Sequence, residues 1–427
     1  MATILKNASD PTTVINGPQY GSATIEGTSG TDVINAYGYF NTIYDNGGND
    51  IVNAGAGSST VYTGSGAVIV NLNGYSDTVI GGDGSDTVLG SAGLATIDLG
   101  NGNDNVSTSG WWNTIKLGNG NDVVAGGQGN ETILLGDGND NVSTSGWWNT
   151  IKLGNGNDLV TAGAGNANIA LGDGTDRVTL GGYWDTMVAG NGNDIVTGGQ
   201  GNETILLGNG NDNVSTSGWW NTIKLGNGND IVAGGQGNET ILLGNGNDNV
   251  SSSGWWNTFE LGNGNDVVSA GSGADTVVAG SGNDTINLAG WSNNVTLGAG
   301  ADIINGGQGG DSITLAGGSA TLNLGGYGEH VTLNGGESAT IVDYAGGLRV
   351  DIGASSGTDV ISGFTADGGG VINLLNGAGG YTSASEIMNS LHADGHGGTL
   401  LALGTSGSID LTGTAPSQLH QGNFAIG

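Results

Sequence analysis

The sequence predicts an all-β fold, a parallel β-roll (β-solenoid) of 18-residue coils with two nine-residue repeats in each coil. Three observations predict it: a nine-residue repeat, an excess of glycine without proline, and aspartates at fixed intervals. From Leu117 the chain reads LGNGNDVVA, GGQGNETIL, LGDGNDNVS and TSGWWNTIK, so two kinds of unit alternate. The 427 residues include 91 glycines but only 3 prolines, which excludes the composition of collagen. A short repeat of this kind is typical of solenoids, in which stacked coils stabilise one another.

The repeat register predicts three parts of the chain. The 18-residue spacing runs from residue 27 to residue 350, so we expect the β-roll over 27–350, an N-terminal cap over 1–26 and a C-terminal cap over 351–427. In the first cap, Val14-Ile15 is expected to form an edge strand that covers the end of the roll. In the second, the segment Ser383–Leu391 is the one expected helix.

Strand alternation predicts which residues fill the core. In the segment 150–153 (Thr-Ile-Lys-Leu), Ile151 and Leu153 fall on the same face, which is the inward one. At the other corner of the coil the equivalent residue is small, as at Gly126, Thr144 and Ala162. Leucines are therefore expected to line one corner of the core: Leu99, Leu117, Leu135, Leu153, Leu171, Leu207, Leu225, Leu243 and Leu261.

The charge balance indicates a cationic partner. Acidic residues outnumber Lys and Arg by 39 to 6, and the formal net charge of -33 argues against nucleic-acid binding and makes a bare compact state self-repelling. The absence of cysteine excludes thiolate metal sites and disulfides. We expect no cleavable signal peptide and no membrane span, because no long apolar run occurs.

Aspartates recur on one edge of the predicted roll, most of them at the end of a turn of the form G-x-G-N-D. This turn resembles the GGxGxD nonapeptide of RTX proteins, the calcium-binding repeats of type I secreted bacterial proteins. The resemblance implies that glycines allow a tight loop whose backbone carbonyls and aspartate carboxylates bind Ca²⁺ between successive turns. The matching residues are Asp86, Asp104, Asp122, Asp140, Asp158, Asp176, Asp194, Asp212, Asp230, Asp248, Asp266, Asp284 and Asp302.

The ladder departs from the family pattern at several points. The first glycine of the family unit is usually leucine here, and Val68 stands where an aspartate is expected, so Asp32 and Asp50 are predicted to form a separate short ladder. After Asp302 the equivalent positions are expected at Ala320 and Ser338. Thirteen aspartates would hold about twelve Ca²⁺ ions, and +24 would bring the net charge from -33 to about -9. Folding and calcium binding are therefore expected to be coupled.

The opposite edge carries a different set of residues. Because asparagine has no charge and glutamate reaches further than aspartate, we expect few or weak ions there, near Asp275 and Asp311 only. The equivalent positions are Asn113, Glu131, Asn149, Ala167, Asp185, Glu203, Asn221, Glu239, Asn257, Asp275, Asn293 and Asp311.

An aromatic residue returns on this second edge every 36 residues. The ladder contains Tyr39, Tyr75, Trp111, Trp147, Tyr183, Trp219, Trp255, Trp291 and Tyr327, and a second ring follows at Phe40, Trp112, Trp148, Trp184, Trp220 and Trp256. One interpretation is that the rings pack over the loops of their own roll. If they face solvent, they indicate a partner, which could be another copy with ridges seated in grooves, a polysaccharide stacked on the rings, or, less favoured, ice.

The C-terminal part and the absence of enzyme motifs complete the prediction. The segments 359–364 and 371–374 resemble the closing region of RTX proteins, and 407–426 resembles their uncleaved secretion signal. The resemblance implies type I export from a Gram-negative bacterium to the outside or surface of the cell. Four histidines without an HExxH motif give no support for an enzyme. We therefore expect a secreted calcium-binding structural protein that self-assembles into a filament, matrix or surface layer; the alternative is a carbohydrate-binding or adhesion rod.

Overall fold

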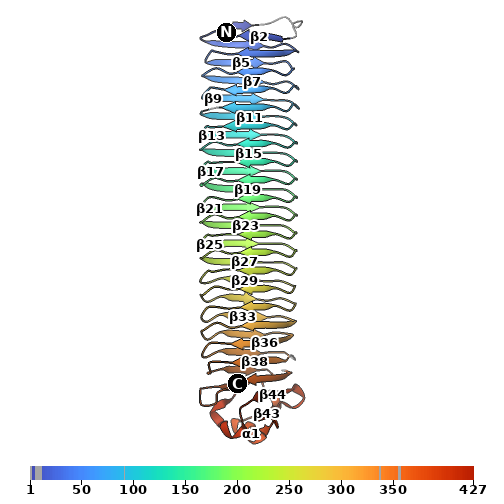
Figure 1. Cartoon of the computed structure of the whole chain (residues 1–427), viewed down its shortest axis with the longest axis vertical. Coiled ribbons are helices and arrows are strands. Elements are labelled where there is room, and N and C mark those ends of the chain that lie inside the picture. Colours follow the sequence, from blue (N-terminus) through green and yellow to red (C-terminus); the bar gives the residue numbers. More distant parts are fainter. Residues whose placement is uncertain (1, 5–11, 91, 336–337, 354–356) are drawn as a thin grey trace. The chain divides into compact units, whose positions relative to one another are not determined.

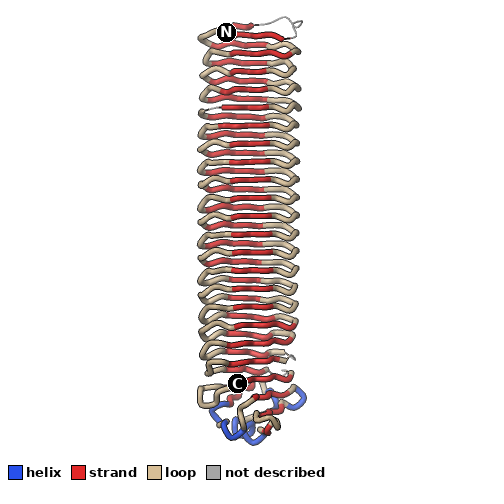
Figure 2. The backbone as a smooth tube through the Cα atoms, in the orientation of Figure 1, coloured by secondary structure: helices blue, strands red, loops and turns tan. Residues whose placement is uncertain are grey.

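A computed structural model describes residues 2–4, 12–90, 92–335, 338–353 and 357–427 (Figures 1 and 2). The chain divides into two compact units, unit 1 (Met1–Asn209) and unit 2 (Gly210–Gly427). In each unit the chain winds into flat coils whose short strands stack in parallel, with turns between them (Figure 2). The predicted all-β parallel β-solenoid is therefore confirmed. None of the helices among these residues is long and apolar enough to cross a membrane.

Each coil contributes one strand to each of two sheets, which we call sheet A and sheet B. In unit 1, sheet A contains β1 (Ala2–Ile4), β3 (Ser22–Glu26), β5 (Phe40–Tyr44), β7 (Ser58–Tyr62), β9 (Ser76–Ile80), β11 (Leu94–Asp98), β13 (Trp112–Lys116), β15 (Asn130–Leu134), β17 (Trp148–Lys152), β19 (Asn166–Ala170), β21 (Trp184–Val188) and β23 (Asn202–Leu206). Sheet B of unit 1 contains β2 (Thr12–Asn16), β4 (Thr31–Asn35), β6 (Ile51–Asn53), β8 (Ile69–Leu72), β10 (Thr87–Gly90), β12 (Asn105–Thr108), β14 (Val123–Ala125), β16 (Asn141–Ser143), β18 (Leu159–Thr161), β20 (Arg177–Thr179) and β22 (Ile195–Thr197).

Unit 2 has the same two-sheet organisation. Its sheet A contains β25 (Trp220–Lys224), β27 (Asn238–Leu242), β29 (Thr258–Glu260), β31 (Thr276–Val278), β33 (Asn294–Leu297), β35 (Ser312–Leu315), β37 (His330–Leu333), β39 (Arg349–Ile352), β41 (Val371–Leu374) and β45 (Phe424–Ile426). Its sheet B contains β24 (Asn213–Ser215), β26 (Ile231–Ala233), β28 (Asn249–Ser251), β30 (Val267–Ser269), β32 (Thr285–Asn287), β34 (Ala301–Asn305), β36 (Ser319–Leu324), β38 (Ala339–Asp343), β40 (Thr358–Ser362), β42 (His392–Ala393), β43 (Thr399–Ala402) and β44 (Ser408–Thr412).

The core forms because equivalent inward residues stack from coil to coil. In sheet A, Ile115 pairs with Ile133, which in turn pairs with Ile151, and all three are fully buried. The nine leucines expected at one corner are all buried, and Thr144 and Ala162 at the other corner are buried as well. Burying a complete side chain of this size contributes roughly 1.5–3 kcal/mol, so the regular stack of apolar residues is the main source of stability.

The 18-residue register ends earlier than the sequence predicts. Ser312 pairs with His330, eighteen residues on, but Ala320 pairs with Ala339 and Thr340 with Val360. The expectation of an unbroken register to Val350 is therefore wrong. The additional residues fall in turns, where loop length is variable, so inward residues such as Leu322 and Ile341 still pair and remain buried.

The C-terminal segment packs onto the last coils of unit 2. β44 pairs in parallel with β40, and β43 pairs with β44 in the antiparallel direction. The expected helix is present as α1 (Ala384–Ser390), where the Ser383 hydroxyl accepts a hydrogen bond from the Glu386 amide at 3.2 Å. Short 3-10 helices accompany it: η1 (Ala378–Gly380), η2 (Gly404–Ser406), η3 (Pro416–Gln418) and η4 (Gln421–Asn423). The edge strand expected around Val14 and Ile15 is β2 in unit 1.

Deleting whole coils should preserve the fold. Removal of residues 119–154 joins Gly118 to Asn155 and restores the turn sequence LGNGND, so every remaining strand keeps its sheet and its inward face. We expect circular dichroism of this variant to show an unchanged strand signal per residue and one cooperative unfolding transition. The control deletion of residues 119–145 removes one and a half coils, so every strand after the junction would have to join the wrong sheet. This control should lose cooperative unfolding. Equal stability of the two variants would contradict the coil as the folding unit.

Candidate functional site

The predicted aspartate ladder lies along one edge, at the turns that lead from sheet A into sheet B; we call it the Asp edge. Its aspartates are almost completely buried, at 1–2% exposure. In unit 1 the backbone N–H of Asp122 donates to Oδ1 of Asp140 at 2.9 Å, and the N–H of Asp140 donates to Oδ1 of Asp158 at 2.9 Å. The same bond recurs in unit 2, from Asp230 to Asp248 at 2.7 Å. Each carboxylate thus links its coil to the preceding one.

In much of the ladder the second carboxylate oxygen has no such partner. These Oδ2 atoms are buried and accept no hydrogen bond within the described chain, although an ionised carboxylate can accept several. A buried polar atom without a partner costs about 1–3 kcal/mol, and more if it is charged. The residues concerned are Asp104, Asp122, Asp140, Asp158 and Asp176 in unit 1, and Asp230, Asp248, Asp266 and Asp284 in unit 2.

Burial also changes the acidity of the Asp edge. Loss of solvent raises the pKa of Asp104, Asp140 and Asp176 to about 7, against the lowering effect of the backbone hydrogen bond. In unit 2 the same cause raises the pKa of Asp266 to about 7 and that of Asp230 to about 6. These carboxylates therefore need either protons or a bound cation near neutral pH.

Glycine is required in the turn because the next coil lies directly against it. Gly120 has φ of 150°, and a methyl group there would lie 1.4 Å from the carbonyl oxygen of Gly102. The asparagines of these turns also bond from coil to coil: the N–H of Asn139 donates to Oδ1 of Asn121 at 2.8 Å. The turns therefore stack backbone on backbone, in the same loops that carry the aspartates.

The Asp edge fits a cation whose ligands are oxygens of both side chains and backbone. Among the residues that the structure describes, no three His, Cys, Asp or Glu side chains form a group able to hold a metal ion. A cation here would therefore need backbone carbonyls in addition to the free Oδ2 atoms. This donor set suits Ca²⁺, which binds six to eight oxygens including carbonyls.

The start of the ladder differs from the regular part. Val68 occupies an aspartate position, as expected, and its N–H donates to Oδ1 of Asp86 at 2.9 Å. The N–H of Asp32 donates to Oδ1 of Asp50 at 2.7 Å, so these two do form a separate pair. Asp45, which the sequence analysis missed, is buried beside them at the corner where later coils have leucine.

The end of the ladder also differs from the prediction. Because one residue is added before β38, the position after Ala320 is Ala339, and the assignment of Ser338 is wrong. The following position is Asp359, whose Oδ1 accepts the N–H of Ala339 at 2.9 Å. Asp359 was missed because turn insertions move it off the 18-residue spacing.

The opposite edge is satisfied mainly by its own hydrogen bonds. In unit 1, Oδ1 and Oδ2 of Asp185 accept the N–H groups of Ala167 and Gly182 at 2.7 and 3.0 Å. In unit 2 both oxygens of Asp311 accept backbone N–H groups, whereas Oδ2 of Asp275 is buried without a partner. Of the two weaker metal candidates, only Asp275 retains a free buried oxygen.

Where the opposite edge carries Glu131 or Glu239, the residue at the adjacent corner of the core is glycine. Oε1 of Glu131 accepts the Nδ2–H of Asn113 at 2.9 Å and the N–H of Gly127 at 3.0 Å. A methyl group at Gly126 would lie 3.2 Å from Cγ of Glu131. In unit 2 a methyl at Gly234 would lie 1.7 Å from Oε2 of Glu239. In the alternate coils the corner is threonine and the partner asparagine, as in the 3.1 Å bond between Asn221 and Thr216.

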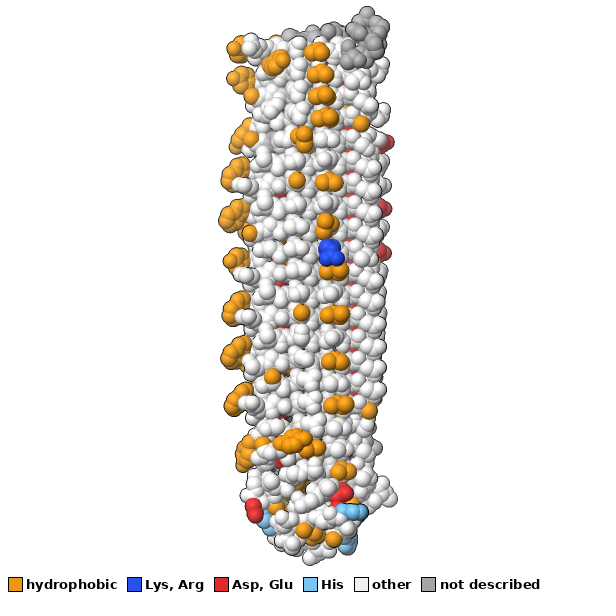
Figure 3. Space-filling view, viewed as in Figure 1, with side chains coloured by type: hydrophobic (Ala, Val, Ile, Leu, Met, Phe, Trp, Pro, Cys, Tyr) orange, Lys and Arg blue, Asp and Glu red, His pale blue; other side chains and the backbone are white. Residues whose placement is uncertain are grey.

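The aromatic rings of this edge face solvent. All the ladder members are exposed, with Trp147 at 68% and Trp111 at 58%. Within each unit, hydrophobic side chains project at intervals along one edge (Figure 3). The interpretation that the rings pack over their own loops is therefore wrong. We call this the aromatic edge; between its ridges lies a groove of about 470 Å³, lined by Trp111, Trp112, Gly129, Asn130, Trp147 and Trp148.

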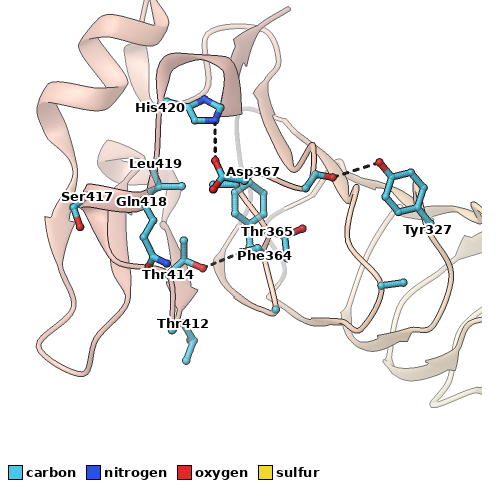
Figure 4. Close-up of a pocket in the computed structure, with 15 residues that line it drawn as sticks. Tyr327, Phe364, Thr365, Asp367, Thr412, Thr414, Ser417, Gln418, Leu419 and His420 are labelled. Carbon is cyan, nitrogen blue, oxygen red and sulfur yellow. Dashed lines mark hydrogen bonds and ion pairs between the residues drawn. The ribbon is translucent and has the colours of Figure 1, made fainter.

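A wider cleft of about 1040 Å³ lies in unit 2, between its last coils and the C-terminal segment (Figure 4). The Thr414 hydroxyl donates to the Phe364 carbonyl at 3.0 Å, and His420 approaches Asp367 at 4.0 Å. The His420 and Asp367 side chains are largely exposed. This contact therefore lies on the exposed side of the cleft.

Comparison with known proteins identifies the repeat. A family model described as Suprabasin, GxHH repeat, matches residues 24–311. The chain belongs to this family. No histidine occurs within the matched part of this suprabasin-repeat chain, so the histidines in the family's description have no counterpart there. The comparison supports a repeat protein and does not return the RTX family. No curated protein and no solved structure matches the chain.

The raised pKa values predict an inverse pH dependence in calcium-free buffer. Because the folded pKa of Asp104, Asp140 and Asp176 is about 7 and the unfolded value is about 4, the folded chain binds more protons between these limits. Stability should be highest below about pH 4 and should fall as pH rises to about 7, measured as the thermal midpoint by circular dichroism. The variant D104N/D140N/D176N should flatten this dependence. A midpoint that rises over the same range would contradict the assignment.

The corner pairing of Gly234 with Glu239 is also testable. Gly234→Ala should destabilise the chain by roughly 1–3 kcal/mol in chemical unfolding, because the new methyl overlaps the Glu239 carboxylate. The double variant Gly234→Thr with Glu239→Asn reproduces the neighbouring Thr216–Asn221 pair and should recover most of the loss. If Gly234→Ala is neutral, the glutamate does not occupy the space left by glycine.

Proposed function

We propose that the chain is an extracellular, calcium-binding structural protein that folds as it binds Ca²⁺ and self-assembles into a filament, matrix or surface layer. The single observation that carries the proposal is the column of buried Oδ2 atoms on the Asp edge. No enzymatic activity is proposed. Calcium would supply positive charge between these carboxylates.

Electrostatics supports the calcium requirement. Successive coils are about 4.8 Å apart, and two charges at that distance repel by roughly 1 kcal/mol in water and about four times that at an effective dielectric of 20. The chain has a net charge of -33 and only 6 basic residues to oppose it. Residues that would hold the ions are Asp104 to Asp176 in unit 1 and Asp230 to Asp284 in unit 2, together with carbonyls of the glycine turns.

The RTX-like turn sequence supports export and location. A chain that folds only with calcium stays unfolded where calcium is scarce, which suits passage through a type I secretion machinery. The C-terminal segment with β44 and β45 is the part that resembles an RTX secretion signal. A cell-surface or extracellular site on a Gram-negative bacterium follows from this resemblance.

Self-association is supported by a regular aliphatic row on sheet B. Val123 and Leu159 in unit 1, and Ile231, Val267 and Ile303 in unit 2, are 39–51% exposed and recur at two-coil intervals. Exposed apolar rows of this regularity mark interaction surfaces. Calcium would also lower the repulsion between copies, because it reduces the net charge of each copy.

A second candidate function, carbohydrate binding, is favoured by the grooves of the aromatic edge.

Calcium titration of the purified chain tests the proposal. At neutral pH we expect little strand signal by circular dichroism without calcium, a cooperative gain on adding it, and ordered assemblies by negative-stain electron microscopy only in its presence. The variant D122N/D140N/D158N keeps the Oδ1 acceptors but removes three charges, so its folding midpoint should shift several-fold towards higher calcium.

A matched control removes charge from exposed aspartates of the glycine turns. Asp137 and Asp173 are exposed and stand where neighbouring coils have Asn119, Asn155 and Asn191, so D137N/D173N should keep the hydrogen bonds of the turns and leave the calcium midpoint nearly unchanged. An unchanged strand signal after complete chelation at neutral pH would refute calcium-coupled folding. Particles that remain single in saturating calcium would refute self-assembly.

A further inference from the structure

Rings and amides alternate along the outer surface of sheet A, beside the aromatic edge. In unit 1, Trp112 pairs with Asn130, which pairs with Trp148, which pairs with Asn166. In unit 2, Trp220 pairs with Asn238. Each of these tryptophans and asparagines is the first residue of its strand. An indole and a carboxamide therefore occupy equivalent positions in consecutive coils.

The spaces between the rings are lined by polar groups. The groove between the 111–112 and 147–148 ridges has Gly129 and Asn130 as its floor. A second groove of about 310 Å³ lies between Trp148 and Trp184 and is lined by Asn149, Thr150, Asn166, Ala167, Asn168 and Thr186. Glycine keeps the first floor low, since a methyl at Gly129 would lie 1.6 Å from the carbonyl oxygen of Trp111.

The grooves contain no charged side chain, although the whole chain carries a formal charge of -33. An anionic ligand would be repelled by the molecule, and a cationic one would find no carboxylate in these grooves to pair with. The lining therefore fits a neutral ligand that has both apolar faces and hydrogen-bonding groups.

These polar groups distinguish between the two partners that the aromatic ladder suggests. If the indoles of a second copy filled the groove, they would remove water from the amides and hydroxyls while offering one N–H donor per ring. Each polar group left unpaired in this way would weaken binding. A sugar polymer instead presents flat C–H faces to the rings and many hydroxyls to the amides.

We propose that the aromatic edge is a binding track for a neutral, β-linked polysaccharide laid along the stack of coils. Sugar faces contact the tryptophans of every second coil, and hydroxyl groups bond Asn130, Asn166 and their equivalents. Rings two coils apart are separated by about 9.6 Å, twice the strand spacing, which is close to the length of a disaccharide. Successive ridges therefore contact successive pairs of sugars, and the weak contacts add along one polymer. The inference rests on the proposed function in one respect, because the aromatic edge forms only when the chain is folded with calcium bound.

Intrinsic fluorescence gives a direct test, because all 10 tryptophans of the chain belong to the aromatic ladder. With the full chain in calcium, titration with cellohexaose should shift or quench tryptophan emission, and calorimetry should show saturable binding. Cellobiose, which spans one interval, should bind at least about tenfold more weakly. Polygalacturonate, an anionic polymer, should not bind.

Variants locate the site. W112A/W148A should weaken cellohexaose binding by about tenfold or more, and N130A/N166A should weaken it while leaving the rings in place. The matched control V123T/L159T changes similarly exposed residues on sheet B of the same unit and should bind as the parent chain does. Circular dichroism of every sample should show the same strand content.

Two outcomes would overturn the inference. The first is no response to cellohexaose at millimolar concentration by a chain that circular dichroism shows to be folded. The second is loss of self-association, measured by sedimentation, in W112A/W148A without any effect on sugar binding, which would make the edge an interface between copies. A chain that folds without calcium but binds cellohexaose would refute the calcium proposal and leave this one standing.

Discussion

The alignment of the turns depends on hydrogen bonds between equivalent groups of consecutive coils. On the Asp edge this bond runs from a backbone N–H to the next aspartate Oδ1, at 2.7–3.0 Å along both units. On the opposite edge, asparagine, aspartate or glutamate oxygens accept the same kind of N–H. Because the backbone N–H at each turn must be bonded when it is buried, a polar side chain with a reachable oxygen is needed in almost every coil. The repeat in the sequence is the result of this requirement.

The two edges bond these buried N–H groups with different amounts of buried negative charge. On the aromatic side an asparagine bonds to an acid of the next coil in several steps, as Asn113 does with Glu131 and Asn257 with Asp275, so one neutral and one charged group share those steps. On the Asp edge the consecutive steps from Asp104 to Asp176 and from Asp230 to Asp284 each carry an acid whose Oδ2 is buried without a hydrogen bond in the described chain. An edge built only for stacking could have used asparagine throughout. This run of buried aspartates is the reason for proposing that Ca²⁺ binds mainly on that side.

Much of the fold could be predicted from the sequence, because inward residues such as Ile151 and Leu153 recur at a constant spacing and spacing determines strand pairing. The order of aspartates on one edge was accessible for the same reason. What could not be predicted depends on turns and on pairs of unlike residues. Asp359 was missed because insertions in turns shift its number, and Asp45 because it replaces a leucine. The direction of the indoles was undecided, since periodicity does not fix where a turn side chain points.

The alternation of Gly126 with Thr144 at the core corner also bears on how such a chain can grow. A glycine coil accepts glutamate and a threonine coil accepts asparagine, so the unit that can be copied without a mismatch is a pair of coils. Residues 102–117, 138–153 and 210–225 are identical in sequence, as expected if the gene lengthened by internal duplication of paired coils. Duplication of a single coil would place neighbouring ridges one or three coils apart, and its product would have lost the even spacing that the rest of the edge retains.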